Sequence, residues 1–538
     1  MNRRLLVSLI AVVTSLVLAT SVAARPTLPE GGMSHKRTIA PDVTGLDKQH
    51  GPHGAFECTV TRRDANANTN TNLDCDDPYP NNEPDVEVNP TNPMNISASS
   101  NDYGSCCDQY YTSVDGAASW STGNMSIEKP LKTGSDPVTV FDRKHGTAMH
   151  ASLSYTLQHA AGTQACDGDV IVSPSRDGGL TWLKPVMVDD GIGCDLSARQ
   201  VFDDKEWIVT DNNPTSPHYG RSYLTWVAFV SAYGAYLESA VRESHSDDGG
   251  FSWSAPHEIS GSNSGLCTLQ ADGAAGECDQ DQGTSPTVGP NGTVYVGFIN
   301  EQNAALQETG EVGEDQYLLV KSTDGGATWS SPTSVVGMED GSRDYPLNVN
   351  GRQTLTGYQL RVWSVGNLVA SPRDGKLYLV FSDNRNGTHD SDNPVTNIDV
   401  FLMVSSNGGA SWSRPRRVDA GAGDQWFPWV DVDPTNGTIW ILYHDRGRSN
   451  GALYNTALAE GTPGSLVKTK LSAHPSDPTH SVFFKAHAAD CDACATFHGD
   501  YIGLSYGSDG VANAAWTDMS VFNAALDGFQ QFIFFARK

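Results

Sequence analysis

Basic residues are scarce in this sequence. The chain has 538 residues, of which 35 are Lys or Arg and 63 are Asp or Glu, so its formal net charge is −28 at pH 7. A surface this acidic repels a phosphate backbone, which argues against nucleic acid as a partner. Three interpretations of the acidity stay open: a solvated acidic surface, cation binding, or a basic or neutral ligand.

Long apolar runs are missing after the first two dozen residues. Residues 1–24 hold Arg3 and Arg4, an apolar run from Leu5 to Leu18 and a final Val22-Ala23-Ala24, which is the layout of a secretory signal peptide. No later stretch is long and apolar enough to cross a bilayer as a helix. We therefore expect a secreted, extracellular protein without a membrane span.

Signatures of two common enzyme classes are also missing. The sequence contains no Gly-x-Ser-x-Gly elbow, so Ser-His-Asp hydrolysis has no local support. The Cys491-Asp492-Ala493-Cys494 segment has the spacing of a redox motif, but no βαβ pattern surrounds it. Neither a serine hydrolase nor a thioredoxin-like enzyme is expected.

Ten cysteines in an exported chain favour disulfides over metal–thiolate sites. Spacing along the chain pairs Cys58 with Cys75, Cys166 with Cys194, Cys267 with Cys278, and Cys491 with Cys494. This leaves the adjacent Cys106 and Cys107. Adjacent Cα atoms lie about 3.8 Å apart, below the usual disulfide range of roughly 4.4–6.8 Å, so a vicinal bridge and exchange with another pair both stay open.

An eight-residue pattern recurs along the chain and organises it. Its copies are Ser113–Trp120, Ser175–Trp182, Ser246–Trp253, Ser322–Trp329 and Ser405–Trp412, and their third residues are Asp115, Asp177, Asp248, Asp324 and Asn407. Each copy predicts a tight hairpin, because the Asp or Asn side chain accepts hydrogen bonds from turn N–H groups and Gly supplies positive φ. The third residues are 62, 71, 76 and 83 positions apart, a period typical of solenoids and propellers.

A second repeat is independent of the first. It has a short apolar strand, a turn rich in Pro, Asn or Gly, and a strand that ends in an aromatic residue and often an Asp. The clearest copies are Pro286–Asn300, Val365–Asp383, Phe427–Asp445 and Tyr501–Asp518, and looser ones are Pro84–Asp102, Pro137–Tyr155 and Trp207–Trp226. Turns such as Asn291-Gly292 between alternating strands predict hairpins.

These repeats leave the number of sheets open between six and seven. Seven copies of the second repeat stand against five of the first. The segments Leu453 to Ala459 and Phe529 to Ala536 can supply third strands without the eight-residue pattern. We therefore favour seven.

In the eight-residue boxes the chain resembles the Asp-box, or BNR-repeat, proteins, whose best-known members are the sialidases. The resemblance implies an all-β fold, a single β-propeller of four-stranded blades. It also implies that each box lies on the hairpin between the third and fourth strands, on the face opposite the active site. We expect the propeller over residues 80–538, after the signal peptide at 1–24 and an irregular segment at 25–79. Within that segment, Ala55 to Thr61 alternates like a strand and is expected to close the ring by extending the last blade.

Strand order predicts which face carries the chemistry. The starts of first strands and the ends of second strands meet on the face opposite the boxes, where a propeller channel opens. Carboxylates that converge there repel one another, so at least one should have a raised pKa and serve as a general acid. The residues expected on this face include Glu83, Asp85, Asp136, Asp204, Lys205 and Asp424.

Candidate site residues follow from the same geometry. The catalytic candidates are Asp383, Asp445, Asp500 and Tyr501, and the substrate-binding candidates are Arg385, Arg446, Glu206, Trp426 and His498. Structural alternatives stay open for several of them. Tyr501 could be a buried aromatic residue, Asp383 and Asp445 could link neighbouring blades, and the two arginines could form ion pairs with nearby Asp residues.

The expected function is that of a secreted glycan-active enzyme. We expect a sialidase-like glycoside hydrolase, in which one carboxylic acid protonates the leaving group and a carboxylate or Tyr acts as nucleophile. Sialidases bind the substrate carboxylate with three arginines, one of them in a Phe-Arg-Ile-Pro-like motif, and this motif is missing here. Two alternatives stay open: a non-catalytic carbohydrate- or protein-binding propeller, and a polysaccharide lyase. The expected ligand is a glycan or polysaccharide, and the expected state is a monomer.

No metal-ligand set is expected in the sequence. Asp431, Asp433 and Asn436 have the oxygen spacing of a Ca²⁺ loop, but the helix-loop-helix pattern is missing. A plain turn is the favoured interpretation. We therefore predict no cofactor, with a structural Ca²⁺ ion at this turn as the alternative.

Overall fold

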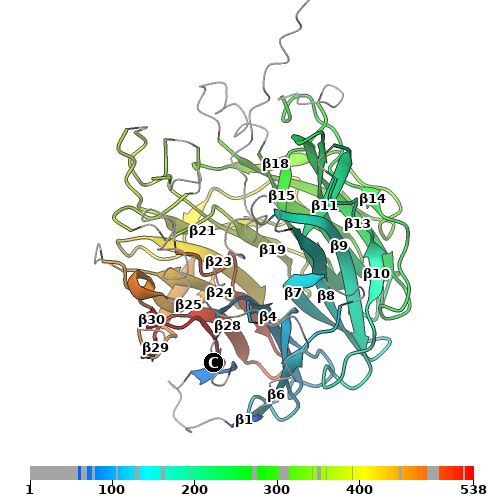
Figure 1. Ribbon diagram of the computed structural model, residues 1–538, viewed down its shortest axis with the longest axis horizontal. Helices are drawn as coiled ribbons and strands as arrows, with labels where there is room; N and C mark the ends of the chain where they lie inside the picture. Colours follow the sequence, from blue (N-terminus) through cyan, green and yellow to red (C-terminus); the bar gives the residue numbers. More distant parts are fainter. Residues whose placement is uncertain are drawn as a thin grey trace, which may run out of the picture.

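The computed structural model shows an all-β chain whose strands form antiparallel sheets, most of them four-stranded (Figure 1). It describes residues 59–61, 70–74, 79–104, 107–127, 132–158, 164–195, 197–268, 276–301, 314–341, 343–347, 353–358, 360–390, 392–447, 451–481, 496–524 and 528–538. The expected signal peptide at 1–24 lies outside these ranges. Within them, no helix is long and apolar enough to cross a membrane.

The first three sheets follow one another along the chain. The first contains β3 (Asn81–Val88), β4 (Ile96–Asp102), β5 (Gln109–Ser113) and β6 (Ser119–Asn124). The second contains β7 (Thr133–Asp142), β8 (Thr147–Gln158), β9 (Gln164–Ser175) and β10 (Val186–Asp189). The third contains β11 (Arg199–Thr210), β12 (Ser222–Ala232), β13 (Ala235–Ser246) and β14 (His257–Glu258), and one parallel pair, Phe202 with Gly168, joins it to the second.

The next three sheets repeat this order, and the last takes its outer strand from the N-terminal segment. The fourth contains β15 (Asp281–Val288), β16 (Val294–Asn300), β17 (Gln316–Ser322) and β18 (Thr333–Gly337). The fifth contains β19 (Gly366–Ala370), β20 (Leu377–Asp383), β21 (Asp399–Ser405) and β22 (Arg416–Arg417). The sixth contains β23 (Gln425–Val432), β24 (Ile439–Asp445), β25 (Asn455–Thr462) and β26 (Ser465–Lys470). The last contains β27 (Gly503–Tyr506), β28 (Ala512–Asp518), β31 (Phe532–Arg537) and β2 (Thr71–Asn72), and β29 (Phe522–Asn523) pairs with β30 (Gly528–Phe529) apart from it.

The innermost strands of the sheets form a closed ring. Strands β3, β7, β11, β15, β19, β23 and β27 each contact the next, and β27 contacts β3. Hydrogen bonds from backbone N–H groups to side chains join neighbours in this ring. Thr139 N donates to Asp85 Oδ2 at 2.8 Å, and Val88 N donates to Ser505 Oγ at 3.1 Å. The second bond joins the first sheet to the last, so the ring closes without a free inner edge.

Two short N-terminal strands complete the outer edges. Strand β1 (Thr59–Thr61) pairs with β6 of the first sheet, so the expectation that this stretch extends the last sheet was wrong. The outer strand of the last sheet is β2, which pairs with β31. The buried Asp74 fixes this arrangement, because its Oδ2 accepts a hydrogen bond of 2.6 Å from Ile533 N.

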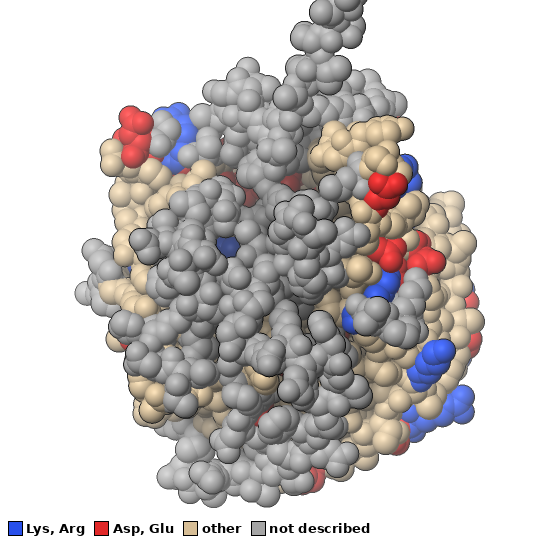
Figure 2. All heavy atoms as spheres, viewed as in Figure 1, with Lys and Arg blue, Asp and Glu red and all other residues tan. Residues whose placement is uncertain are grey.

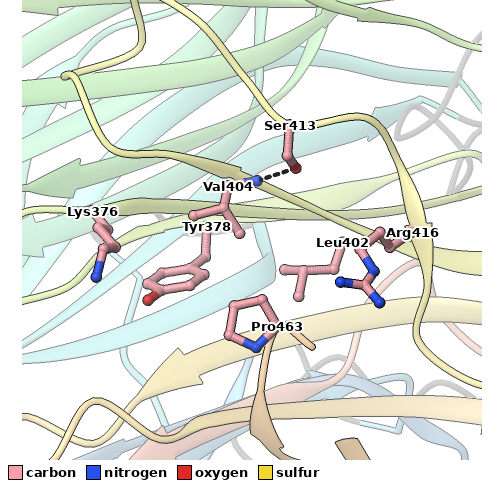
Figure 3. Close-up of a pocket in the computed structure, with 7 residues that line it drawn as sticks. All are labelled: Lys376, Tyr378, Leu402, Val404, Ser413, Arg416 and Pro463. Atoms are coloured by element: carbon pink, nitrogen blue, oxygen red, sulfur yellow. Dashed lines mark hydrogen bonds between the residues drawn. The ribbon is translucent and has the colours of Figure 1, made fainter. Parts of the chain in front are cut away.

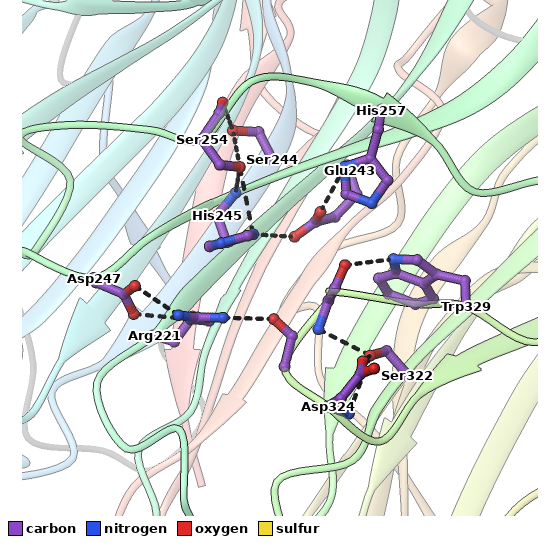
Figure 4. Close-up of polar contacts among 12 residues, drawn as sticks. Arg221, Glu243, Ser244, His245, Asp247, Ser254, His257, Ser322, Asp324 and Trp329 are labelled. Atoms are coloured by element: carbon purple, nitrogen blue, oxygen red, sulfur yellow. Dashed lines mark hydrogen bonds and ion pairs between the residues drawn. The ribbon is translucent and has the colours of Figure 1, made fainter.

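The five boxes form the predicted hairpins between third and fourth strands. In each box the third residue accepts a hydrogen bond from a turn N–H group, as Asp324 Oδ1 does from Thr328 N at 3.0 Å. The box turns also bind the neighbouring sheet. Arg221, which follows β11, donates to the carbonyl oxygen of Gly325 at 2.7 Å (Figure 4). The predicted turn chemistry is confirmed, and the boxes also lock one sheet onto the next.

Two of the predicted disulfides are present. Cys166 pairs with Cys194, and Cys267 pairs with Cys278. No cysteine among the described residues is free. The predictions for Cys58, Cys75, Cys106, Cys491 and Cys494 fall outside the described residues.

Candidate functional site

Several innermost strands bend near their starts, on the predicted functional face. Strands β3, β7, β11, β15 and β23 each contain a β-bulge where their register shifts against the next strand. The residues at the bulges have φ angles of 57°, 58°, 50°, 58° and 50°, and they are Glu83, Asp136, Lys205, Gly283 and Phe427. Such angles cost a non-glycine residue free energy, and this strain concentrates at functional sites. The bulges also re-aim the side chains they carry.

Three of the bulged residues join a buried group of ionisable side chains, which we call the central cluster. The Lys205 ammonium interacts electrostatically with Asp136, Glu83, Glu206 and Asp500, although these residues come from four different sheet units. The full cluster is Glu83, Asp136, Asp204, Lys205, Glu206, Arg361, Asp500 and Tyr501, each at most 5% exposed. The ring of innermost strands therefore gathers charged groups at its axis.

Direct contacts tie the first and last sheets together within this cluster. Arg361 Nη2 lies 2.8 Å and 3.0 Å from the two carboxylate oxygens of Asp500. Glu83 accepts hydrogen bonds from Asp500 N at 3.1 Å and from Asn101 Nδ2 at 2.5 Å. These bonds hold Glu83 and Asp500 in defined positions.

The side chains of Lys205 and Glu206 are not held by hydrogen bonds in the way that those of Glu83 and Asp500 are. The Lys205 ammonium lies 3.1 Å from the ring centroid of Tyr501 and 4.5 Å from that of Trp207. Among the described residues, neither this ammonium nor either carboxylate oxygen of Glu206 has a hydrogen-bond partner. Buried polar groups are normally hydrogen-bonded, so a buried acid and a buried amine without such bonds are exceptional within the cluster.

The charges of the central cluster do not balance. Its five carboxyl groups face two cations, Lys205 and Arg361. Burial, together with the nearby Asp136 carboxylate, raises the pKa of Glu206 and of Asp204 well above its usual range. Burial also lowers the pKa of Lys205. At neutral pH the cluster therefore holds protons on carboxyl groups, which is what a general acid requires.

Aromatic side chains meet across the ring next to the cluster. Trp207 of β11 lies 4.7 Å from Trp429 of β23 and 5.5 Å from Tyr501, measured between ring centroids. The three residues come from the third, sixth and last sheets, so they contact one another across the ring. They give the polar cluster an apolar wall against which a flat ligand face could stack.

Two predicted catalytic residues lie in ion pairs. The Arg385 guanidinium binds both oxygens of Asp383, with Nε at 2.8 Å and 3.1 Å. Asp445 pairs with Lys468 at 2.5 Å, and the same ammonium also binds Asp419. Arg385 thus forms the kind of ion pair with a nearby Asp that the sequence left open for it. Catalysis by Asp383 or Asp445 stays a prediction.

The predicted binding residues divide between two environments. Glu206 lies in the central cluster, whereas Arg446 pairs with Asp424 at 2.8 Å. Trp426 and His498 pack against each other in the buried interior, with 3.4 Å between their ring nitrogens. Burial lowers the pKa of His498 to about 3, so this imidazole is neutral at physiological pH. The binding roles of these residues stay predictions.

Arg361 is the residue that the sequence analysis missed. It lies in the connection between β18 and β19, outside every repeat, and its backbone N–H donates to Thr496 O at 3.0 Å. Nothing in the repeats marks it. For Glu83 and Asp136 a signal was present, since each stands directly before a proline at the start of a first strand.

The side chains of Asp431 and Asp433, the alternative Ca²⁺ ligands, accept hydrogen bonds from other parts of the protein. Asp431 Oδ2 accepts a hydrogen bond from Tyr506 N at 2.7 Å and so links the sixth and last sheets. Asp433 Oδ1 accepts from Thr435 N at 2.7 Å, and its Oδ2 accepts from the Tyr506 hydroxyl at 3.0 Å. These bonds are those of a turn and of a contact between sheets.

A separate pocket of about 250 Å³ lies between the fifth and sixth sheets (Figure 3). It is lined by Lys376, Tyr378, Leu402, Val404, Ser413, Arg416 and Pro463. These residues include no carboxylate, so they cannot supply the acid of an acid–base pair.

On the described surface seen in Figure 2, acidic and basic side chains are interspersed, with both signs at the upper left and along the right-hand side.

No protein-family model matches the sequence, and no curated protein sequence matches it. Several solved structures resemble the fold across most of the chain. The Hadza microbial sialidase Hz136 has a TM-score of 0.40 and 14% identity, over 68% of this chain and 63% of that one. The NanB sialidase from Streptococcus pneumoniae has a TM-score of 0.41 and 10% identity, over 82% and 83%. A Penicillium chrysogenum α-L-arabinanase has a TM-score of 0.44 and 12% identity, over 74% and 99%.

These comparisons show structural similarity to sialidase β-propellers at low identity. The chain spans less than two thirds of the length of Hz136. Another similar structure, from Dyadobacter fermentans, is of a protein of unknown function. Activity therefore has to be argued from the site itself.

Proposed function

We propose that this protein is a secreted glycoside hydrolase whose active site is the central cluster. The observation that carries the proposal is Glu206, a fully buried carboxyl group without a hydrogen-bond partner among the described residues, beside a second carboxylate and a lysine. Glycoside hydrolysis needs a protonated carboxylic acid next to an ionised group. The cluster supplies both.

The proposed scaffold is a single propeller over residues 80–538 with seven blades, one for each innermost strand of the closed ring. The N-terminal segment at 25–79 contributes the outer strand of the last blade through β2. Export is supported by the Cys166–Cys194 and Cys267–Cys278 disulfides, because such bonds persist in oxidising compartments.

In the proposed mechanism two carboxyl groups have different protonation states. Glu206 stays protonated through burial and the nearby Asp136 charge, so it donates a proton to the glycosidic oxygen. Asp500 serves as the base or nucleophile, because the Arg361 guanidinium at 2.8 Å stabilises its ionised form. Environments that separate the protonation of two carboxyl groups in this way assign the acid and the base.

Tyr501 has a supporting role in this proposal. Burial, with the surrounding carboxylates, raises the pKa of Tyr501 well above its usual range, so its hydroxyl is protonated at neutral pH. We therefore assign it to the aromatic wall, with Trp207 and Trp429, and not to nucleophilic attack.

The charge of the cluster selects the class of glycan. With Glu206 and Asp204 protonated, the cluster still has three other carboxyl groups against two cations, and Arg361 is already paired with Asp500, so an anionic sugar is disfavoured. A neutral sugar can donate its hydroxyl groups to carboxylates and stack a ring face on an aromatic side chain. We propose a neutral glycan as the substrate.

Activity measurements on Glu206→Gln test this function. The purified protein is assayed for reducing-sugar release from neutral polysaccharides and for sialic acid release from glycoproteins. General acid catalysis contributes typically 10²–10⁴-fold, so Glu206→Gln should lower kcat/KM on the active substrate by about that factor. Glu460→Gln, at a surface carboxylate that pairs with Lys538, is the control and should keep full activity. A hydrolase whose Glu206→Gln variant retains wild-type activity would refute the assignment.

A binding protein without catalysis is the second candidate. The burial of the cluster favours it, because charged groups at most 5% exposed can serve the stability of the ring alone. Saturable binding of a glycan without any turnover, in a protein that is folded, would select this candidate over the hydrolase.

A further inference from the structure

A second polar cluster lies between the fourth and fifth sheets, outside the central cluster. Glu339, Asp344 and His389 each offer one ligand atom, and these atoms all lie within 4.8 Å of one another. We propose that these three side chains bind one divalent transition-metal ion. This metal site does not depend on the proposed glycosidase activity.

The donor set selects the class of ion. Zn²⁺ binds imidazole nitrogen and carboxylate oxygen, often through three protein ligands with a water molecule in the fourth position. Ca²⁺ and Mg²⁺ prefer oxygen ligands alone, so one imidazole among three ligands favours a transition-metal ion. Zn²⁺ is therefore the probe of choice.

Asp344 supplies an independent sign that a ligand is expected. Its side chain is 1% exposed, and its Oδ1 contacts His389 Nδ1. Its Oδ2 is buried and has no hydrogen-bond partner among the described residues. A carboxylate oxygen in this position is costly to bury unless something offsets its charge.

Access to the site is open from one side. The His389 side chain is 37% exposed, and Glu339 is half-buried. An ion could therefore enter from solvent and reach the buried oxygen of Asp344 last. The exposure also leaves room for water in the remaining coordination positions.

The end of β20 holds all three ligand-bearing segments in place. Asp383 Oδ2 accepts a hydrogen bond from Glu339 N at 3.1 Å, and Asn384 N donates to Glu339 O at 3.1 Å. The Asn384 side-chain amide also donates to the carbonyl oxygen of Asp344. His389 follows the same strand six residues after its last residue, Asp383. Asp383, Asn384 and Arg385 thus act as positioning residues for the proposed site.

Nearby acids add negative charge that a dication would offset. Glu314 Oε2 accepts hydrogen bonds from Asp340 N at 2.8 Å and from Gly341 N at 2.6 Å. Arg385 lies close by, but its guanidinium already binds both oxygens of Asp383.

Zinc titration of the chelator-stripped full-length protein tests the proposal. Affinity is measured by calorimetry, and metal content is measured by mass spectrometry after gel filtration. The wild type should bind one Zn²⁺ per chain. His389→Ala and Glu339→Gln should weaken binding by more than roughly 10-fold, since even outer-shell changes cost 10–100-fold at metal sites. Both positions are partly exposed, so both variants should fold, which circular dichroism can check.

The matched control is His257→Ala. His257 is also a partly exposed histidine beside a buried carboxylate, Glu243 at 3.5 Å, but it lies on the third sheet near the box of the fourth (Figure 4). This variant should keep wild-type Zn²⁺ affinity. Three results would each overturn the proposal: no stoichiometric Zn²⁺ in the wild type, unchanged affinity in His389→Ala, or equal affinity for Ca²⁺ and Zn²⁺.

Discussion

The third box offers a quantitative test of how much one Asp-box side chain stabilises the protein. Asp248 accepts hydrogen bonds from Phe251 N at 2.9 Å, Ser252 N at 3.0 Å, Ser252 Oγ at 2.6 Å and Ser246 Oγ at 2.9 Å. Asp248→Ala removes all four. Water can replace part of each bond because the turn is largely exposed, so a net loss of about 0.5 kcal/mol per bond is reasonable. The free energy of unfolding should therefore fall by about 2 kcal/mol.

The chain contains its own control for this substitution. The fifth box has Asn407 at the same place, where Oδ1 accepts from Ser411 N at 3.0 Å and Nδ2 donates to Ser411 Oγ at 2.8 Å. Asp248→Asn can make the corresponding bonds with Ser252. It should cost less than about 0.5 kcal/mol, since Oδ1 keeps its bonds and the Ser252 hydroxyl can accept from the new Nδ2 instead of donating, so the bonds are kept while the charge is lost.

Denaturant unfolding is the appropriate assay. Unfolding entropy is roughly 2.1 cal/mol/K per residue, so for a chain of 538 residues that unfolds as one unit a loss of 2 kcal/mol shifts Tm by only about 2 °C. The change in urea midpoint at constant m-value resolves the difference better. The reasoning is refuted if Asp248→Asn is as damaging as Asp248→Ala, because charge and not acceptance would then matter. It is equally refuted if Asp248→Ala leaves the midpoint unchanged.

Three further predictions concern the covalent and ionic framework. Replacing Cys166 and Cys194 by Ser removes a disulfide that joins residues 28 positions apart. The loop-entropy relation predicts that the free energy of unfolding, measured in urea, falls by about 3–4 kcal/mol. An unchanged urea midpoint would contradict this prediction. Thiol titration of the denatured, unreduced protein should find less than one reactive thiol per chain, and four or more would contradict an oxidised framework. Burial raises the folded-state pKa of Asp85 and of Asp431 to about 7. The stability associated with these groups is fully present below the unfolded pKa of about 4 and is lost as pH rises to 7, by up to about 1.4 kcal/mol per pH unit for each group. The urea midpoint should therefore be higher at pH 5 than at pH 8, and a midpoint that rises over this range would contradict the assignment.

The local elements of this protein could be predicted from residue types and spacing alone. The box at Ser322–Trp329 closes through bonds between residues at most four positions apart, so its residue types suffice to predict the turn. The Cys166–Cys194 pair is similar, because the two residues flank a single hairpin and have few nearby competitors. Period and composition were also enough for the all-β class, since the sheets before the last are each built on four strands that follow one another along the chain.

Which groups meet at the centre depends on contacts between residues far apart in the chain. Arg361 reaches Asp500 across 139 positions, and β2 pairs with β31 although they lie at opposite ends of the described chain. The bulges at Glu83 and Lys205 cannot be predicted from the sequence of a single repeat either. Their positive φ angles are imposed by neighbouring strands and not by the residue type. Asp383 shows the same limit. Its place at a strand end was predictable from the repeat, but whether it faces a substrate or holds the Glu339 backbone depends on a distant segment folding against it. Such contacts depend on how the closed ring brings separate sheets together, which no local pattern specifies.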